Sequence, residues 1–189
     1  MSMHQLDRAE LEAGLPGILE SPKDAGVLAL IVQRPAIDER TVVETGLLST
    51  EDGLVGDSWK ARAGRSNRNQ SMHADMQLTI MNARAAALVA QDRSRWPLAG
   101  DQLYVDLDLG VENLPPGSRL RIGEAVVEIT AIPHRGCSKF RKRFGLAAME
   151  FVNSEVGCAL NLRGVNARVV TGGRVGIDDV VLVERRGTG

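Results

Sequence analysis

The feature that most constrains the fold is a strictly alternating run, QLYVDLDL at residues 102–109. Leu103, Val105, Leu107 and Leu109 fall on one face of an extended strand, and the residues between them fall on the other. This period of two predicts a β-strand in a sheet with one face in the core and one face in water.

Further short strand-like runs recur along the chain, bounded by Gly, Pro or Asp. They span residues 27–33, 41–48, 76–81, 119–122, 125–132, 166–173 and 178–184. Gly123-Glu124 fits the turn of a hairpin between two of these strands. Helical patterns are few: residues 5–13, a helix capped by Asn82, and a stretch after residue 137 that breaks near Gly145. Short strands with glycine turns and few helices favour a β-barrel over alternating βα units.

The length of 189 residues fits one domain. We expect residues 1–25 to form an N-terminal helix, ended by GLPG, and a linker, and residues 26–186 to form a single barrel domain. Residues 58–75, which include His73, are polar and follow neither period, so they predict a long surface loop.

Composition excludes some classes of function and location. A net charge of -1 and 3% aromatic residues argue against binding to nucleic acid or to a membrane surface. No apolar run approaches the roughly 18–20 residues of a membrane-spanning helix, and the N-terminus lacks a signal-peptide pattern. We therefore expect a cytoplasmic protein in which Cys137 and Cys158 are free thiols. Two cysteines are too few for an ordinary iron–sulfur cluster, so electrons for redox chemistry would come from an external donor protein.

The segment IPHRGCSKFRKRFG, residues 132–145, carries the strongest local charge bias. No acidic residue lies between Glu128 and Glu150, and this gap holds five cations, Arg135, Lys139, Arg141, Lys142 and Arg143. Cationic neighbours, with a helix N-terminus near Cys137, favour the thiolate, which is both the nucleophile and the metal ligand. The same positive field would hold a phosphate. Cys158 has apolar neighbours and is predicted to lie in the core.

Other interpretations of this segment remain open. A lone cysteine is most often a small buried hydrophobe, and a basic run is most often a solvated helix face. His134 and Cys137 form an H-x-x-C pair of the kind found in zinc sites, although the chain offers few partners for the three or four ligands that zinc needs. His134 would either orient the loop or move protons.

Taken in order, several segments resemble the molybdenum-cofactor sulfurase C-terminal (MOSC) family. They are GLVGD at 53–57, MQLTIMNARAAALVA at 76–90, LAGDQLYVDLDLGVENLPPGSRLRIGEAVVEITAIPHRGCSKF at 98–140, FGLAAMEFVNS at 144–154 and LRGVNARVVTGGRVGIDDVVLVE at 162–184. The most specific part is the order of an Asn-Leu turn, a hairpin, a cysteine after a strand and a closing glycine-rich strand pair.

This resemblance implies a mainly β fold, a twisted, mostly antiparallel β-barrel with a few short helices. It also implies a cysteine at the barrel mouth, which falls on Cys137. In family members that reduce N-hydroxylated compounds, this cysteine is a ligand of molybdenum carried by a pterin cofactor (molybdopterin). By resemblance, Cys137 is the metal ligand and acts in catalysis with His134. The expected cofactor-binding residues are Arg135, Lys139 and Arg141, which would face the pterin phosphate, and Asp57, Asn113, Asn166 and Arg168.

Three functions follow as hypotheses. The first is a molybdenum-dependent oxidoreductase that reduces small N-hydroxylated or related N–O substrates; without an appended N-terminal barrel or iron–sulfur domain, the chain is similar to small stand-alone members of the family. The second is a sulfur carrier that holds a persulfide on Cys137 and delivers sulfur for metal–sulfur cofactor assembly. The third is a ligand-binding barrel whose cysteine is not catalytic.

Overall fold

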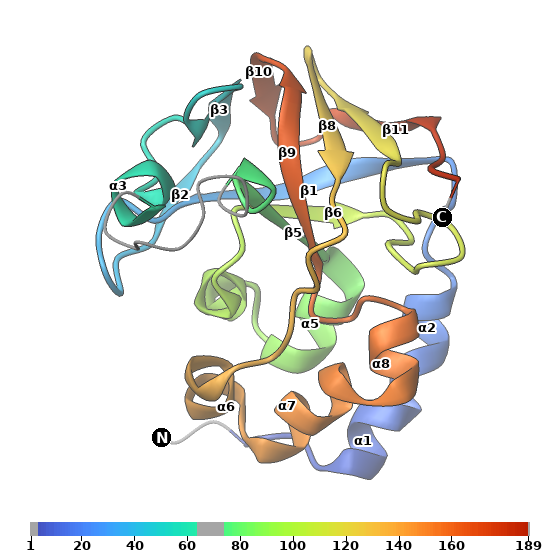
Figure 1. The fold of residues 1–189 in the computed structure, drawn as a ribbon. Coiled ribbons are helices and arrows are strands. Elements are labelled where there is room, and N and C mark those ends of the chain that lie inside the picture. The colour runs from blue at the N-terminus through green and yellow to red at the C-terminus, as the bar shows by residue number, and fades with distance from the viewer. Residues whose placement is uncertain (1–3, 64–73, 189) are drawn as a thin grey trace.

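Seven strands close into a mixed β-barrel in the computed structural model, which describes residues 4–63 and 74–188 (Figure 1). In order around the barrel they are β1 (Ala25–Gln33), β11 (Val180–Arg185), β7 (Arg119–Ile122), β8 (Ala125–Ile129), β9 (Val165–Thr171), β5 (Leu78–Asn82) and β6 (Leu103–Asp106). The pairing of β6 with β1 closes the ring. Only the β5–β6 pair is parallel, so the predicted mainly β, mostly antiparallel barrel is confirmed.

Smaller strands extend one side of the barrel. β2 (Thr41–Val43) pairs with the end of β1. β10 (Gly173–Gly176), β3 (Thr45–Ser49) and β4 (Gly53–Leu54) form a separate three-stranded sheet.

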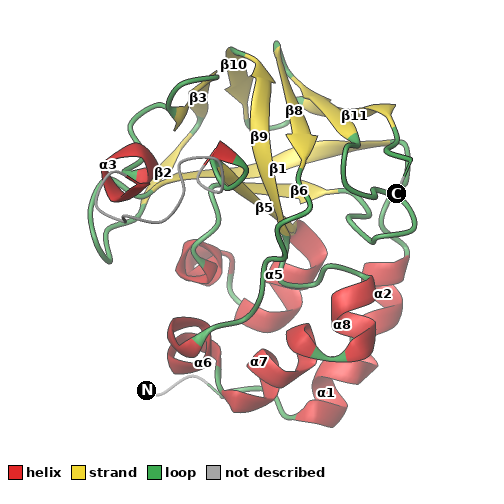
Figure 2. Ribbon diagram, viewed as in Figure 1, coloured by secondary structure: helices red, strands yellow, loops and turns green. Residues whose placement is uncertain are grey.

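Helices gather at one end of the barrel, as the red ribbons of Figure 2 show. They are α1 (Arg8–Ala13), α2 (Leu15–Leu19), α5 (Ala83–Ala90), the 3-10 helix η1 (Arg93–Ala99), α6 (Ser138–Phe144), α7 (Leu146–Asn153) and α8 (Glu155–Ala159). Another helix, α3 (Trp59–Ala63), lies apart from these (Figure 1). None of the helices in the described ranges is long and apolar enough to cross a membrane.

The chain builds two apolar cores. Leu28, Ile31 and Leu103 belong to the first, which fills the barrel interior. Tyr104 and Phe140 belong to the second, which lies between the barrel wall and the helices. Two layers of buried side chains therefore flank the wall of the barrel at its helix-covered end.

The predicted wet face of residues 102–109 is wrong. β6 covers only Leu103–Asp106, and both Gln102 and Tyr104 are fully buried on the face that was expected to meet water. The Tyr104 hydroxyl donates to the carbonyl of Trp96 over 2.6 Å, and the Gln102 side chain accepts from the backbone N–H of Thr79. The helix layer covers this face, and an alternating pattern in one strand carries no information about a layer supplied by other segments.

Other boundaries also differ from the sequence-based expectations. The strand expected at 41–48 is split at Glu44 into β2 and β3, and the loop expected at 58–75 begins with helix α3. Residues 64–73, with His73, lie outside the described residues. GLPG does not end the helical region, because α2 starts directly after Gly14 with proline in its first turn, where a missing N–H costs nothing.

Local capping signals were predicted correctly. The Asn82 side chain accepts from the backbone N–H groups of Arg84 and Ala85 at the start of α5. Gly145, with φ of 96°, separates α6 from α7 in the left-handed region that favours glycine. A third short helix, α8, follows this pair.

Candidate functional site

Cys137 is the last residue of the connection between β8 and α6, residues 130–137. Its backbone is extended, with φ of -115°, and α6 begins at the next residue. The residue is exposed, so the thiol is accessible and the buried-hydrophobe interpretation does not apply.

Asn153 holds the backbone immediately before Cys137. Its Oδ1 accepts from the Gly136 N–H over 2.8 Å, and its Nδ2 donates to the Gly136 carbonyl over 3.0 Å. A Cβ on Gly136 would lie 3.0 Å from Val152 Cγ2 and 3.2 Å from Asn153 Nδ2, so only glycine packs here without a shift. The end of α7 thus sets where the thiol stands, and the sequence analysis missed Asn153.

His134, Asp101 and Arg163 form a buried polar group behind this connection. His134 Nε2 lies 3.0 Å from Asp101 Oδ1, and Arg163 Nη1 donates to Asp101 Oδ2 over 2.6 Å. The Asp101 side chain is fully buried and that of Arg163 is 6% exposed. Because an ionised carboxylate can only accept, Nε2 of His134 carries the hydrogen and Nδ1 is its proton-accepting atom.

The group perturbs the acidity of its members. Burial acts to raise the pKa of Asp101, but Arg163 and His134 outweigh it and hold that pKa well below its usual range. The pKa of His134 is lowered by burial and then by Arg163, against the opposing effect of Asp101. The fold therefore favours a neutral imidazole beside an ionised carboxylate.

The thiol of Cys137 is also perturbed. Partial burial acts to raise its pKa. The opposite effect comes from the backbone N–H groups of Phe140 and Lys139 and from the charge of Arg163. Together these outweigh burial, so the pKa of the thiol lies below its ordinary value. No side-chain hydrogen bond from Cys137 caps α6, so these N–H groups act through their polarity. The fold therefore shifts the Cys137 equilibrium toward the thiolate, the direction that the sequence analysis expected.

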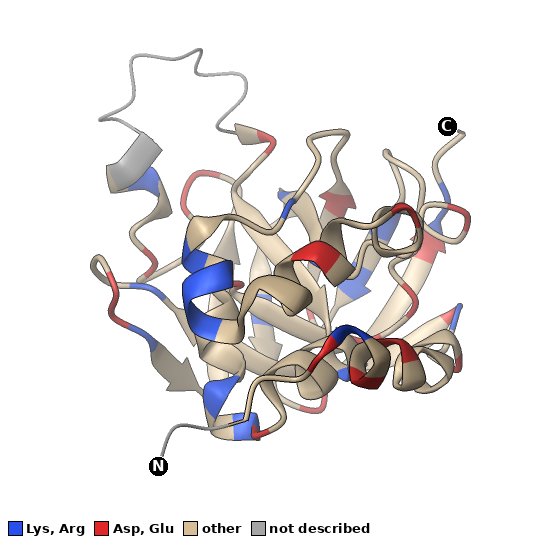
Figure 3. Cartoon of the chain, turned by 90° about the horizontal axis from the view of Figure 1, so that it is seen from below, with Lys and Arg blue, Asp and Glu red and all other residues tan. Residues whose placement is uncertain are grey.

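The source of that effect differs from the one expected. Figure 3 shows Lys and Arg gathered along α6, where Lys139, Arg141 and Lys142 are exposed. The leading charge effect on the thiol pKa comes instead from the buried Arg163, whose guanidinium lies 5.0 Å from the centre of the Phe140 ring. Arg163 is distant in sequence from the basic run, and no local charge pattern marked it.

Asn166, one of the cofactor-binding residues expected from the resemblance, contacts the connection to Cys137. It is fully buried, and its Nδ2 donates to the Ile132 carbonyl over 3.0 Å. Its Oδ1 is buried with no hydrogen-bond partner among the described residues. Asn166 therefore anchors the start of the connection and keeps an unused acceptor.

Three other members of the expected set, Asp57, Asn113 and Arg168, are engaged elsewhere in the structure. Asp57 accepts from Arg34 Nε over 2.8 Å in a buried ion pair. The Asn113 side chain donates to two backbone carbonyls in the turns around it, and Arg168 pairs with Glu128 on the barrel wall over 2.7 Å. In this structure these side chains therefore hold turns and strands together.

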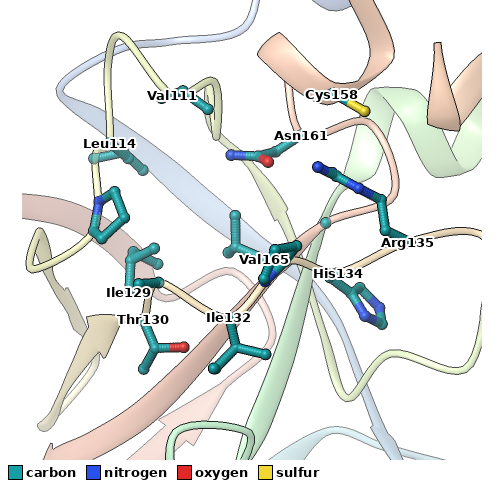
Figure 4. Close-up of a pocket in the computed structure, with 14 residues that line it drawn as sticks. Val111, Leu114, Ile129, Thr130, Ile132, His134, Arg135, Cys158, Asn161 and Val165 are labelled. Atoms are coloured by element: carbon teal, nitrogen blue, oxygen red, sulfur yellow. The ribbon is translucent and has the colours of Figure 1, made fainter. Parts of the chain in front are cut away.

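Arg135 extends into a pocket on the other side of the connection, toward Asn161 and Cys158 (Figure 4). The pocket measures about 160 Å³ and borders a larger one of about 930 Å³ that shares Arg135 and Cys158. Cys158 is half-buried rather than in the core, and its Sγ–H donates to the Asn153 carbonyl. Cys137 lines neither of these two pockets, which are formed by described residues.

The described residues do not provide a set of ligands for zinc. Within residues 4–63 and 74–188, no three His, Cys, Asp or Glu side chains group as metal ligands. His134 is instead engaged with Asp101.

The perturbed thiol predicts a measurable reactivity profile. In a Cys158→Ser variant, the rate of Cys137 alkylation by iodoacetamide should rise with pH around a midpoint below the ordinary cysteine value of about 8.5. The reason is that helix N–H groups and Arg163 stabilise the thiolate. Stopped reactions followed by mass spectrometry measure it, with Cys137→Ser as the control that reports Cys158 alone. A midpoint at or above the ordinary value would contradict the prediction.

Comparison with known proteins gives structural neighbours only. The sequence matches no family model and no curated protein. The fold is similar to the crystal structure of the YuaD protein from Bacillus subtilis, with a TM-score of 0.60 and 13% identity over 83% of this chain and 94% of that one.

YiiM proteins are also similar. YiiM from Escherichia coli matches with a TM-score of 0.54 and 20% identity, over 86% of this chain and 72% of that one. YiiM from Geobacillus stearothermophilus matches with a TM-score of 0.54 and 15% identity, over 89% and 77%. YiiM is a MOSC-domain protein, so this likeness supports a MOSC-like fold for the chain.

Proposed function

We propose that this chain is a MOSC-family protein that binds the molybdenum–pterin cofactor through Cys137 and reduces small N-hydroxylated or related N–O substrates. The observation that carries the proposal is an exposed cysteine on a MOSC-like barrel whose thiol pKa is lowered by the fold. A thiolate is a ligand suited to a soft metal–sulfur bond.

The residues present fit such a cofactor. Cys137 offers an accessible sulfur, and Asn166 Oδ1 is a buried acceptor without a partner among the described residues, as a donor on a pterin would require. When bound, the molybdenum would supply the two-electron chemistry that no side chain here offers. An external electron donor protein would provide the electrons.

The side chains of the protein itself would hold the sulfur of Cys137 in position and would move protons. Asn153 and Asn166 fix the two ends of the connection and so hold the sulfur of Cys137 in place. His134 is kept neutral by burial and by Arg163, and Asp101 fixes its tautomer. Its Nδ1 would therefore accept or return a proton during substrate reduction.

Elemental analysis tests the proposal. Protein purified from a host that makes the cofactor should carry molybdenum, Cys137→Ser should carry none, and Cys158→Ser should carry as much as the unchanged protein. A metal-free wild-type sample from such a host, or equal loading in Cys137→Ser, would overturn it.

A persulfide carrier is the second candidate, favoured by the same accessible, acidic thiol. Intact-mass spectrometry separates it from the first: the carrier would show a reductant-labile gain of one sulfur that disappears in Cys137→Ser. The third hypothesis, a ligand-binding barrel without a catalytic cysteine, is less favoured. It predicts a buried, unreactive Cys137, whereas Cys137 is exposed.

A further inference from the structure

Four arginines from separate parts of the chain surround the end of η1. Arg143 of α6 donates to the Leu98 carbonyl over 2.8 Å, and Arg163 donates to the Ala99 carbonyl over 2.8 Å. Arg34, which follows β1, donates to the Gly100 carbonyl over 2.9 Å. The fourth, Arg40, precedes β2 and lies close enough to feel the charges of Arg143 and Arg34.

Three of these arginines have a carboxylate partner. Asp57 pairs with Arg34 over 2.8 Å, Asp38 with Arg143 over 3.0 Å and Asp101 with Arg163 over 2.6 Å. The aspartates therefore balance three of the four positive charges.

Arg40 is the arginine of the four that has no carboxylate partner among the described residues. None of the ion pairs in the described part of the chain includes it, and its Nη1 donates to the Glu39 carbonyl. Its Nε is buried with no partner among the described residues. Burial, then Arg143 and Arg34, lower its pKa, against the opposing charge of Asp38. A half-buried cation held among other cations is costly unless an anion joins it.

The structure leaves room for such an anion over Gly100. A Cβ built on this glycine, whose φ is 96°, would lie 3.8 Å from Arg40 Nη2 and 3.9 Å from Arg143 Nη1. No other described atom outside its chain neighbours comes within 4 Å of that point. Two guanidinium groups therefore flank one open position that carries no side chain.

We propose that Arg40 and Arg143 bind a phosphate group over Gly100, with Arg34 and Arg163 holding the surrounding loop in place. Guanidinium groups match the oxygens of phosphate with paired N–H donors. Two of them suit a phosphate dianion better than a single carboxylate. The source of the phosphate, a cofactor or a phosphorylated substrate, rests on the proposed function; the binding itself does not.

Calorimetric titration of inorganic phosphate into cofactor-free protein tests the site. The unchanged protein should bind phosphate, more weakly as salt is added, and Arg40→Gln should weaken binding by about tenfold or more. Arg8→Gln, at an exposed pair with Glu12, is the matched control and should bind as the unchanged protein does. No binding by the unchanged protein, or equal binding by Arg40→Gln, would overturn the proposal.

Thermal unfolding excludes a purely structural role for Arg40. In phosphate-free buffer, Arg40→Gln should unfold at the same temperature as the unchanged protein or higher, because a repelled cation has been removed. Added phosphate should raise the midpoint of the unchanged protein and not that of Arg40→Gln. A large drop for Arg40→Gln without any effect of phosphate would show that Arg40 serves the fold alone.

Two further samples separate this site from the proposed function. Cys137→Ser should still bind phosphate, even if molybdenum is absent from every preparation. In protein from a cofactor-making host, loss of molybdenum in Arg40→Gln with normal Cys137 alkylation identifies the cofactor as the source of the phosphate. Unchanged loading with lost phosphate binding identifies a phosphorylated substrate. Either of these two outcomes for Arg40→Gln supports the proposal that Arg40 and Arg143 bind phosphate.

Discussion

Asp101→Asn is expected to destabilise the protein by about 3–5 kcal/mol, because it leaves the charge of Arg163 buried without its carboxylate. Asp101 is fully buried and contacts both Arg163 and His134. Urea unfolding followed by circular dichroism measures the change. The variant should also lose the fixed orientation of His134, since an amide oxygen is a weaker acceptor than a carboxylate.

Asp24→Asn is the control for this variant. Asp24 pairs with Arg186 at an exposed position, where an ion pair contributes at most about 1 kcal/mol. Similar losses in the two variants would contradict the interpretation of Asp101 as the centre of a buried charge group.

The same group sets the direction of the pH dependence. The folded pKa of Asp101 lies below its ordinary value of 3.8, so its contribution to stability is present above pH 3.8 and is lost as the pH falls toward the folded value. The folded pKa of His134 also lies below its ordinary value of 6.5, so the unfolded chain takes up that proton first and stability again falls with acid. Both groups therefore make the protein acid-labile, and Asp101→Asn should flatten the acid limb of the stability curve.

Phe140→Ala is expected to cost about 3–5 kcal/mol, the range for removing a buried aromatic side chain. Phe140 is 1% exposed, its ring centre lies 4.9 Å from that of Phe144, and the Arg163 guanidinium lies 5.0 Å from the same ring centre. Its loss should open a cavity in the second core, between the barrel wall and the helices, next to α6. Thermal or urea unfolding measures the effect.

Two variants calibrate this result. Phe140→Leu keeps most of the volume and should cost less than Phe140→Ala. Leu146→Ala, at a position 44% exposed on α7, should change stability by about 0.5 kcal/mol or less. A loss for Phe140→Ala no greater than that for Leu146→Ala would show that α6 does not depend on this contact.

Local patterns in the sequence were enough for several elements and for the fold class, although they did not indicate α2, α3 or the split of the strand expected at 41–48. Alternation located β6, Gly123-Glu124 marked the hairpin, and Asn82 and Gly145 marked helix ends, because each signal depends only on neighbouring residues. The length of the strand runs and the scarcity of helices then indicated a barrel, and the structure has one.

The candidate site was only partly predictable. Cys137 stood out through its basic neighbours, yet those side chains mostly face water and the charge that acts on the thiol comes from Arg163. Asn153 and Asp101 position the site from helices and loops far from residue 137 in sequence. Such partners meet only when the chain folds, so no local signal marks them.

By itself, the sequence determined the position of several strands and helix ends and that the strands would form a barrel, since these depend on short-range periodicity and turn chemistry. Only the tertiary structure decided that both faces of β6 are buried, that Asp57 and Arg168 hold the scaffold, and that Arg40 has no carboxylate partner among the described residues. The physical reason is that burial and ion pairing are properties of groups brought together across the chain, and the identity of each partner is fixed only by packing.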